Sequence, residues 1–122
     1  MEKGIDMAKH PVTHFEFTAK DSKKLQTFYG GVFGWKLSDA PMDYKMIDTD
    51  AGGHGIGGGI GQSRDGKGGL TVYVETDDLK GTLAKIEKAG GRTIMPPMQT
   101  GPVEIALFAD PEGNVVGLAK GM

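Results

Sequence analysis

The fold is decided by residues 12–37, which read VTHFEFTAKDSKKLQTFYGGVFGWKL. The apolar residues Val12, Phe15 and Phe17 among the first eight predict a strand. Because successive strand residues point to opposite faces, Phe15 and Phe17 share one face, and His14 and Glu16 share the other. The apolar residues that follow recur every three or four positions, which predicts a helix.

The predicted helix has one apolar face, which carries Leu25, Phe28, Tyr29, Val32 and Phe33. Residues able to cap its two ends flank it: Asp21 or Ser22 at the start and Gly34 at the end. Three extended segments come next, and we interpret them as strands: WKL, YKMID and GIGGGIGQ.

The second half of the chain repeats this order of elements. Residues 70–91, LTVYVETDDLKGTLAKIEKAGG, predict a strand and a helix, and RTIM, VEIALFAD and NVVGLAK predict three more strands. A shift of 57 residues places His14 on Thr71 and Gly34 on Gly91. The stretch DPEGN before the last strand is typical of a tight turn. The repeat therefore predicts two copies of one βαβββ unit.

Neither half can bury its apolar helix alone, so we expect both modules in one domain. Module one spans about residues 12–62 and module two about residues 69–120. The predicted fold is α+β: the modules form a cupped, mixed eight-stranded sheet with the helices on its outer face. The concave face is then the expected place for a small-molecule ligand.

The composition excludes several classes of protein. The 122 residues include no cysteine, which excludes a disulfide framework, a cysteine zinc site and a thiol nucleophile. A formal net charge of −2 argues against nucleic acid or an anionic membrane as partner. No apolar run is long enough to span a bilayer, and residues 1–11 lack a signal-peptide pattern. We expect a cytoplasmic protein.

Glycine is concentrated in the middle of the chain, where 10 of the 21 glycines lie between residues 51 and 70. Residues 53–58 match the pattern GxGxxG, but the sequence after them cannot open a helix, so a dinucleotide site is not predicted. His54 lies among these glycines and is expected in an exposed loop. His10 and His14 are four residues apart, but Pro11 between them argues against a metal-binding helix.

The βαβββ repeat, the opening THFEFTAKDSKKLQTFYGGVFGWKL and the close ALFADPEGNVVGLAK resemble the vicinal oxygen chelate superfamily. This superfamily includes glyoxalase I, bleomycin-resistance proteins, extradiol dioxygenases and methylmalonyl-CoA epimerase. The resemblance covers about residues 12–120, and it is greatest to small glyoxalase-like proteins. It supports the predicted fold and says little about a reaction.

The resemblance implies a divalent metal site in which four strands each lend one ligand. Of the four positions, His14 retains an imidazole, Thr71 offers a poor ligand, and Gly117 stands where a glutamate is usual. The remaining strand, GIGGGIG, carries no carboxylate or imidazole. One histidine does not hold a divalent ion against water, so we predict a degenerate metal site and no cofactor. A divalent metal is the disfavoured alternative.

His14 and Glu16 are the candidate catalytic residues, since they share a strand face and an imidazole titrates near neutral pH. In β-strand VEIALFAD we expect the aliphatic set Val103, Ile105 and Leu107 to face the helices, which turns Glu104 and Phe108 toward the cavity. The candidate ligand-binding residues are His14, Glu16, Thr71, Tyr73, Glu104 and Phe108. A polar-lined cleft without catalysis is the alternative.

Two functions follow. The first is a glyoxalase/bleomycin-resistance-like protein that binds a small molecule in the concave sheet face. The alternative is a glyoxalase-like lyase or isomerase that acts on a small carbonyl compound or thiol adduct. The expected partners are a small-molecule ligand and a second copy of the chain, as in many relatives, with no nucleic acid and no membrane.

Overall fold

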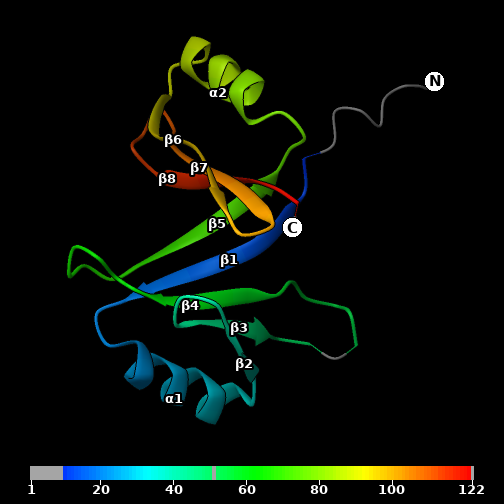
Figure 1. Cartoon of the computed structure of the whole chain (residues 1–122), viewed down its shortest axis with the longest axis vertical. Helices are drawn as coiled ribbons and strands as arrows, with labels where there is room; N and C mark the ends of the chain where they lie inside the picture. The colour runs from blue at the N-terminus through cyan, green and yellow to red at the C-terminus, as the bar shows by residue number, and fades with distance from the viewer. Residues whose placement is uncertain (1–9, 51, 122) are drawn as a thin grey trace. The chain divides into compact units, whose positions relative to one another are not determined.

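The computed structural model describes residues 10–50 and 52–121. Within them lie eight strands and two helices, in the order strand, helix and three strands, twice (Figure 1). Their bounds are β1 Val12–Ala19, α1 Ser22–Phe33, β2 Lys36–Ala40, β3 Tyr44–Asp48, β4 Gly58–Gln62, β5 Gly69–Glu75, α2 Leu79–Lys88, β6 Arg92–Thr100, β7 Val103–Ala109 and β8 Val115–Lys120. This order confirms the predicted α+β fold with two βαβββ modules.

The chain divides into two compact units, which we describe one at a time. One unit is His14–Val72, and the residues before and after it form the other. The cupped sheet and the single domain stay predictions, because both concern how the two modules are placed against each other. The absence of a signal peptide was predicted mainly from residues outside the described range. Among the described residues, neither helix is long and apolar enough to cross a membrane.

In the unit His14–Val72 the strand order is β2-β3-β4-β1. Strands β1 and β4 are parallel, and β3 is antiparallel to both of its neighbours. Phe15 and Phe17 of β1 pack against a buried core, as their place in the alternating pattern predicted. The fully buried members of that core are Ala19, Ile47 and Ile60.

Helix α1 begins and ends at the residues that the sequence indicated. The Asp21 carboxylate accepts a hydrogen bond from the Lys24 N–H at 3.1 Å, which caps the first turn. Gly34 takes the left-handed conformation, with φ of 69°, and its N–H donates to the Gly30 carbonyl at 3.0 Å. A left-handed residue after the last turn favours glycine because a Cβ is strained there.

The apolar face predicted for α1 is only partly buried. Leu25 packs into the core, and the Tyr29 ring stacks on Phe17 with 4.6 Å between centroids. Phe28 and Val32, however, are 54% and 59% exposed. The five apolar residues lie on one stripe that is narrower than half of the helix circumference, and periodicity alone does not tell how much of that stripe the strands cover.

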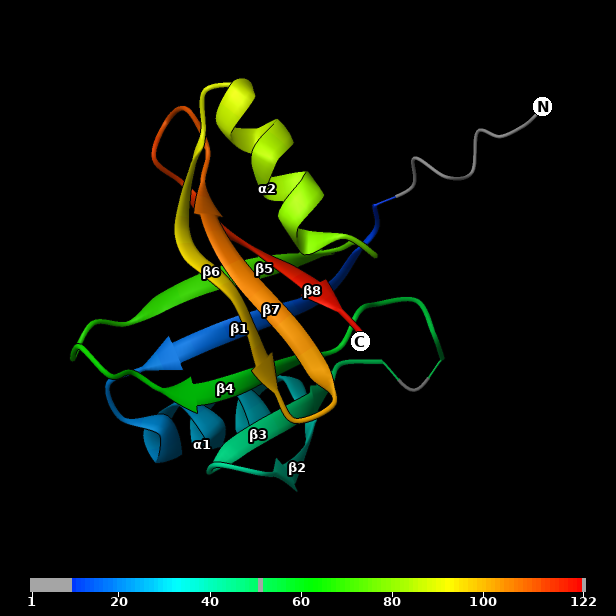
Figure 2. The same ribbon diagram turned by 45° about the horizontal axis from the view of Figure 1, so that its top comes forward.

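The other unit has the strand order β5-β8-β7-β6, with β5 and β8 parallel and β7 antiparallel to both of its neighbours. Helix α2 lies along β6 and β7 (Figure 2). The Asp78 carboxylate caps it by accepting the Gly81 N–H at 2.9 Å. Four fully buried side chains form the core between helix and strands: Leu79, Leu83, Ala106 and Leu118.

The orientation predicted for β7 was wrong. Phe108 packs with Ala106 against the core formed by α2, so the even-numbered residues of β7 face the helix. Strand β7 is apolar on both faces, and alternation cannot then tell which face meets the helix. The turn before β8 is as predicted: Asp110 accepts from the N–H groups of Glu112 and Asn114, both at 2.9 Å.

Candidate functional site

His14 is a buried polar residue of the unit His14–Val72, with only 6% of its surface exposed. It lies on β1, on the face opposite Phe15. Its Nε2 is 2.9 Å from the Tyr44 hydroxyl of β3, which is a hydrogen-bond distance. The two rings are nearly parallel, with 25° between planes and 6.4 Å between centroids. This contact links β1 to β3 through two residues that are 30 positions apart in the chain.

Glycines in β4 allow Tyr44 to reach across the sheet. Strand β3 pairs with β4 through Met46 and Gly59, and Tyr44 lies two residues before Met46 on the same face. A Cβ on Gly59 would overlap the phenol ring of Tyr44, and one on Gly61 would lie 3.2 Å from its Cδ1. The ring therefore occupies space that other residues at these two positions would fill.

Burial lowers the pKa of His14 below its ordinary value, since the charged imidazolium loses its hydration there. The imidazole is therefore neutral at pH 7. In the tautomer with the proton on Nδ1, the Tyr44 hydroxyl donates to Nε2. A neutral imidazole beside a phenol can accept a proton and can exchange hydrogen bonds with a carbonyl or hydroxyl group.

Glu16 lies on the same strand face as His14, two residues further along β1, where it pairs with Gly59 in the sheet register. It is partly buried. The structure therefore brings together the two predicted catalytic candidates, and Tyr44 joins them on that face. Thr71, in the same unit, lies on β5 and is partly buried.

The remaining predicted ligand-binding residues belong to the other unit. Tyr73 is buried, and its ring covers Gly117 of β8. Glu104 is partly buried and lies opposite Lys120 of β8 in the register. Phe108 lies in the core of α2. The cavity-facing roles predicted for Glu104 and Phe108 both rested on the wrong orientation of β7, so we carry neither further.

The sequence interpretation did not name Tyr44. A signal was present: glycines 57, 59 and 61 alternate along one strand, which leaves one of its faces without side chains. A bare strand face leaves room for a large side chain from a neighbouring strand. Nothing in the sequence says which strand supplies it, because that depends on the pairing of β3 with β4.

Neither of the other two histidines belongs to this group. His54 lies in an exposed loop, as expected, and its backbone N–H donates to the Asp50 carboxylate. His10 is exposed, and its Nδ1 lies 3.1 Å from the Glu75 carbonyl.

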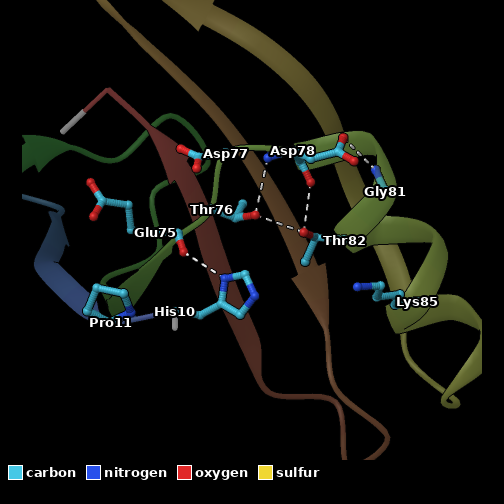
Figure 3. A pocket seen from close by; sticks show the side chains of 9 residues that line it. All are labelled: His10, Pro11, Glu75, Thr76, Asp77, Asp78, Gly81, Thr82 and Lys85. Carbon is cyan, nitrogen blue, oxygen red and sulfur yellow. Dashed lines mark hydrogen bonds between the residues drawn. The ribbon is translucent and has the colours of Figure 1, made fainter. Parts of the chain in front are cut away.

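His10 borders a cavity of about 290 Å³ beside the first turn of α2 (Figure 3). In this cavity the buried Thr76 hydroxyl lies 3.0 Å from that of Thr82 and accepts the Asp78 N–H at 3.3 Å. The hydroxyl of Thr82 donates to the Asp78 carbonyl at 2.7 Å. These two threonine hydroxyl groups take part in the hydrogen bonds of the first turn of the helix, so neither is reserved for a ligand.

The sequence profile of the Glyoxalase/Bleomycin resistance protein/Dioxygenase superfamily matches residues 12–118. The chain belongs to this superfamily. A glyoxylase-like domain-containing protein of Didymella fabae is 30% identical over 115 residues, which are 84% of this chain and 88% of that protein. The anthracycline biosynthesis protein DnrV of Streptomyces peucetius is 33% identical over 118 residues. That match covers 81% of this chain and 42% of DnrV, so the chain spans about two fifths of that relative.

Solved structures of the glyoxalase superfamily share the fold at low sequence identity. Methylmalonyl-CoA epimerase of Mycobacterium tuberculosis superposes with a TM-score of 0.69 at 12% identity, over 91% of this chain and 87% of the epimerase. The Mn(II)-bound glyoxalase of Novosphingobium aromaticivorans gives a TM-score of 0.64 at 16% identity, over 93% of this chain and 40% of that protein. At such identities the likeness concerns the fold alone.

The residues present do not fit the metal site that the glyoxalase superfamily implies. Gly117 of β8 stands where the superfamily usually has a glutamate, and Gly59 of β4 has the same register position in the first module, since it pairs with Glu16 as Gly117 pairs with Tyr73. The rings of Tyr44 and Tyr73 occupy the space beside them. Between residues 10 and 121, position 51 aside, no three His, Cys, Asp or Glu side chains gather closely enough to hold an ion. We therefore derive no chemistry through a metal.

Proposed function

We propose that this chain binds a small organic molecule at the sheet face that carries His14, Glu16 and Tyr44, without help from a metal. The observation that carries the proposal is the hydrogen bond between His14 Nε2 and the Tyr44 hydroxyl, 2.9 Å long, at a buried imidazole. Such a pair offers fixed polar atoms next to an aromatic ring, which is the usual make-up of a small-molecule site.

The chemistry of the pair favours a planar, oxygenated aromatic ligand. The Tyr44 ring can stack on an aromatic system, and the neutral imidazole and phenol can bond to its carbonyl and hydroxyl oxygens. Glu16 adds an acceptor for a ligand hydroxyl. The similarity to DnrV, described as an anthracycline biosynthesis protein, supports this class, since anthracyclines are hydroxylated aromatic quinones.

Calorimetry and thermal shift with quinizarin, a dihydroxyanthraquinone, test the proposal in buffer with a metal chelator. We expect saturable binding that raises the melting temperature. Tyr44→Phe removes one hydrogen bond, so the affinity should fall about fivefold to tenfold, from a loss of roughly 1 kcal/mol. His54→Ala is the matched control, because it removes an exposed histidine of the same unit. Equal affinity in wild type and His14→Ala would contradict the proposal.

The alternative is a glyoxalase-like isomerase or lyase. The observation that favours it is the buried imidazole of His14 beside the Tyr44 hydroxyl. Burial lowers the pKa of His14, which favours the neutral form that a general base requires. His14 would take the proton from the hydroxyl-bearing carbon of a hemithioacetal and return it to the neighbouring carbonyl carbon. The hydroxyl proton would pass to the oxygen of that carbonyl, which gives the thioester of a 2-hydroxy acid. Turnover of the methylglyoxal–glutathione adduct in the presence of chelator, lost in His14→Ala but kept in His54→Ala, would favour this reaction. No turnover in the wild type would remove it.

A homodimer and a cytoplasmic location also belong to the proposal. Apolar surface on α1 supports the dimer: Phe28, Val32 and Phe33 are each more than half exposed. Light scattering at several protein concentrations tests the dimer, and cell fractionation tests the location.

A further inference from the structure

The space above the β4 glycines, which the Tyr44 ring fills, is a feature of the unit His14–Val72 that the proposed function does not explain. Gly59 lies beside Glu16 in the register of β1 and β4, on the face that also carries His14. Any Cβ at position 59 would overlap the Tyr44 hydroxyl and the ring carbon that bears it. A side chain at 59 and the observed position of Tyr44 therefore exclude each other.

The other unit repeats this arrangement with a different tyrosine. Tyr73 of β5 stands 57 residues after Glu16, and it pairs with Gly117 of β8 as Glu16 pairs with Gly59. A Cβ on Gly117 would overlap the Tyr73 ring. Both modules thus have a glycine at the same register position of the last strand, with a tyrosine ring in the space beside it.

We infer that Tyr44 takes the place of a metal ligand in this chain: its ring fills the space of a side chain at position 59, and its hydroxyl binds the imidazole nitrogen that an ion would bind. Tyr44 is then a positioning residue for His14. The inference goes beyond the proposed ligand and does not depend on it.

Because the Tyr44 ring and a side chain at position 59 exclude each other, the inference has a structural consequence that can be measured without any ligand. If position 59 carries a side chain, the ring of Tyr44 must move, and its hydroxyl then leaves His14. With the ring removed, a carboxylate at position 59 would share one sheet face with His14 and Glu16. An imidazole and two carboxylates are a sufficient ligand set for Zn²⁺ or Co²⁺.

The test compares Co²⁺ binding, followed by visible absorption and calorimetry, in wild type and two double variants. Tyr44→Ala/Gly59→Glu supplies a carboxylate in open space, and Tyr44→Ala/Gly59→Gln is its uncharged match. We expect no stoichiometric ion in the wild type. We expect the Glu variant to bind one Co²⁺ on the order of tenfold or more tighter than the Gln variant, and to lose it with His14→Ala.

Two results would overturn the inference. One is a wild-type chain that binds one Co²⁺ and loses it in His14→Ala, since Tyr44 would then not exclude the ion. The other is equal Co²⁺ affinity of the Glu and Gln variants.

A second measurement checks the contact between the ring and the glycine. Gly59→Ala should lower the melting temperature in the wild-type background and much less in Tyr44→Ala, because the two positions are coupled. Nitrogen NMR of His14 should show the loss of its Tyr44 partner in Gly59→Ala, as in Tyr44→Phe. An equal cost of Gly59→Ala in both backgrounds, with His14 unchanged, would also overturn the inference.

Discussion

At the scale of single residues, the contact between His14 and Tyr44 decides the character of the site. His14 is buried, its pKa is lowered by that burial, and Tyr44 fixes its Nε2 at 2.9 Å. A fixed, neutral imidazole suits hydrogen bonding or proton transfer without an ion. The burial of His14 and its contact with Tyr44 each give a prediction.

The first concerns the dependence of stability on pH. Because the pKa of His14 is lower in the folded state than in the unfolded chain, the unfolded chain binds more protons as the pH falls. The free energy of unfolding should therefore decrease as the pH falls through the unfolded-state value of 6.5 toward the lower folded-state pKa. Urea unfolding at pH 7.5 and 5.5 measures this, and His14→Gln should reduce the slope while His54→Gln should not.

The second concerns the phenol hydroxyl. Tyr44→Phe keeps the ring over Gly59 but leaves the buried imidazole without this partner, which should cost about 1–3 kcal/mol of unfolding free energy. Urea unfolding gives the value. Tyr29→Phe is the matched control, because the stacking of its ring on Phe17 and Trp35 is kept. An unchanged stability of Tyr44→Phe would mean that water replaces the hydroxyl without loss.

At the scale of helices and strands, the sequence predicted where an element begins and ends better than it predicted which of its faces is buried. The caps at Asp21 and Gly34 were correct, because each end is set by local hydrogen bonds and backbone geometry. The face of α1 was only partly correct, and that of β7 was wrong. The apolar stripe of α1 is only partly covered, and β7 is apolar on both faces, so the packing partner decides which side chains are buried.

The capping of α2 gives a prediction at this scale. Asp78→Ala removes the acceptor for the Gly81 N–H and should lower the unfolding free energy by about 1 kcal/mol. Asp78→Ser keeps a capping oxygen and should recover most of that loss. Urea unfolding followed by circular dichroism measures both variants. A loss of the same size in Asp78→Ser would show that the capping hydrogen bond is not the cause.

At the scale of the whole molecule, each compact unit has its own core. Ile60 is 0% and Leu118 1% exposed, and they lie in different units. Ile60→Ala and Leu118→Ala should each cost about 2–5 kcal/mol, the range for large-to-small changes in a close-packed core.

Trp35, the single tryptophan, lies against the core that holds Ile60, so its fluorescence reports on that unit. Ile60→Ala should shift the unfolding curve that this fluorescence follows. If Leu118→Ala shifts that curve equally, the two units unfold together. If circular dichroism alone detects its effect, they unfold separately.

The sequence by itself determined the βαβββ repeat, the helix caps, the turn at Asp110 and the membership of the superfamily. These features depend on neighbouring residues, on periodicity and on similarity along the chain. The placement of His14 and Glu16 on the same strand face also followed from the sequence, because side chains along a strand alternate between its two faces. Only the tertiary structure showed that Tyr44 contacts His14 and that Phe108 packs in the core against α2. Those outcomes depend on which strands pair, in which register, and which face the helix covers, and no stretch of sequence carries that information alone.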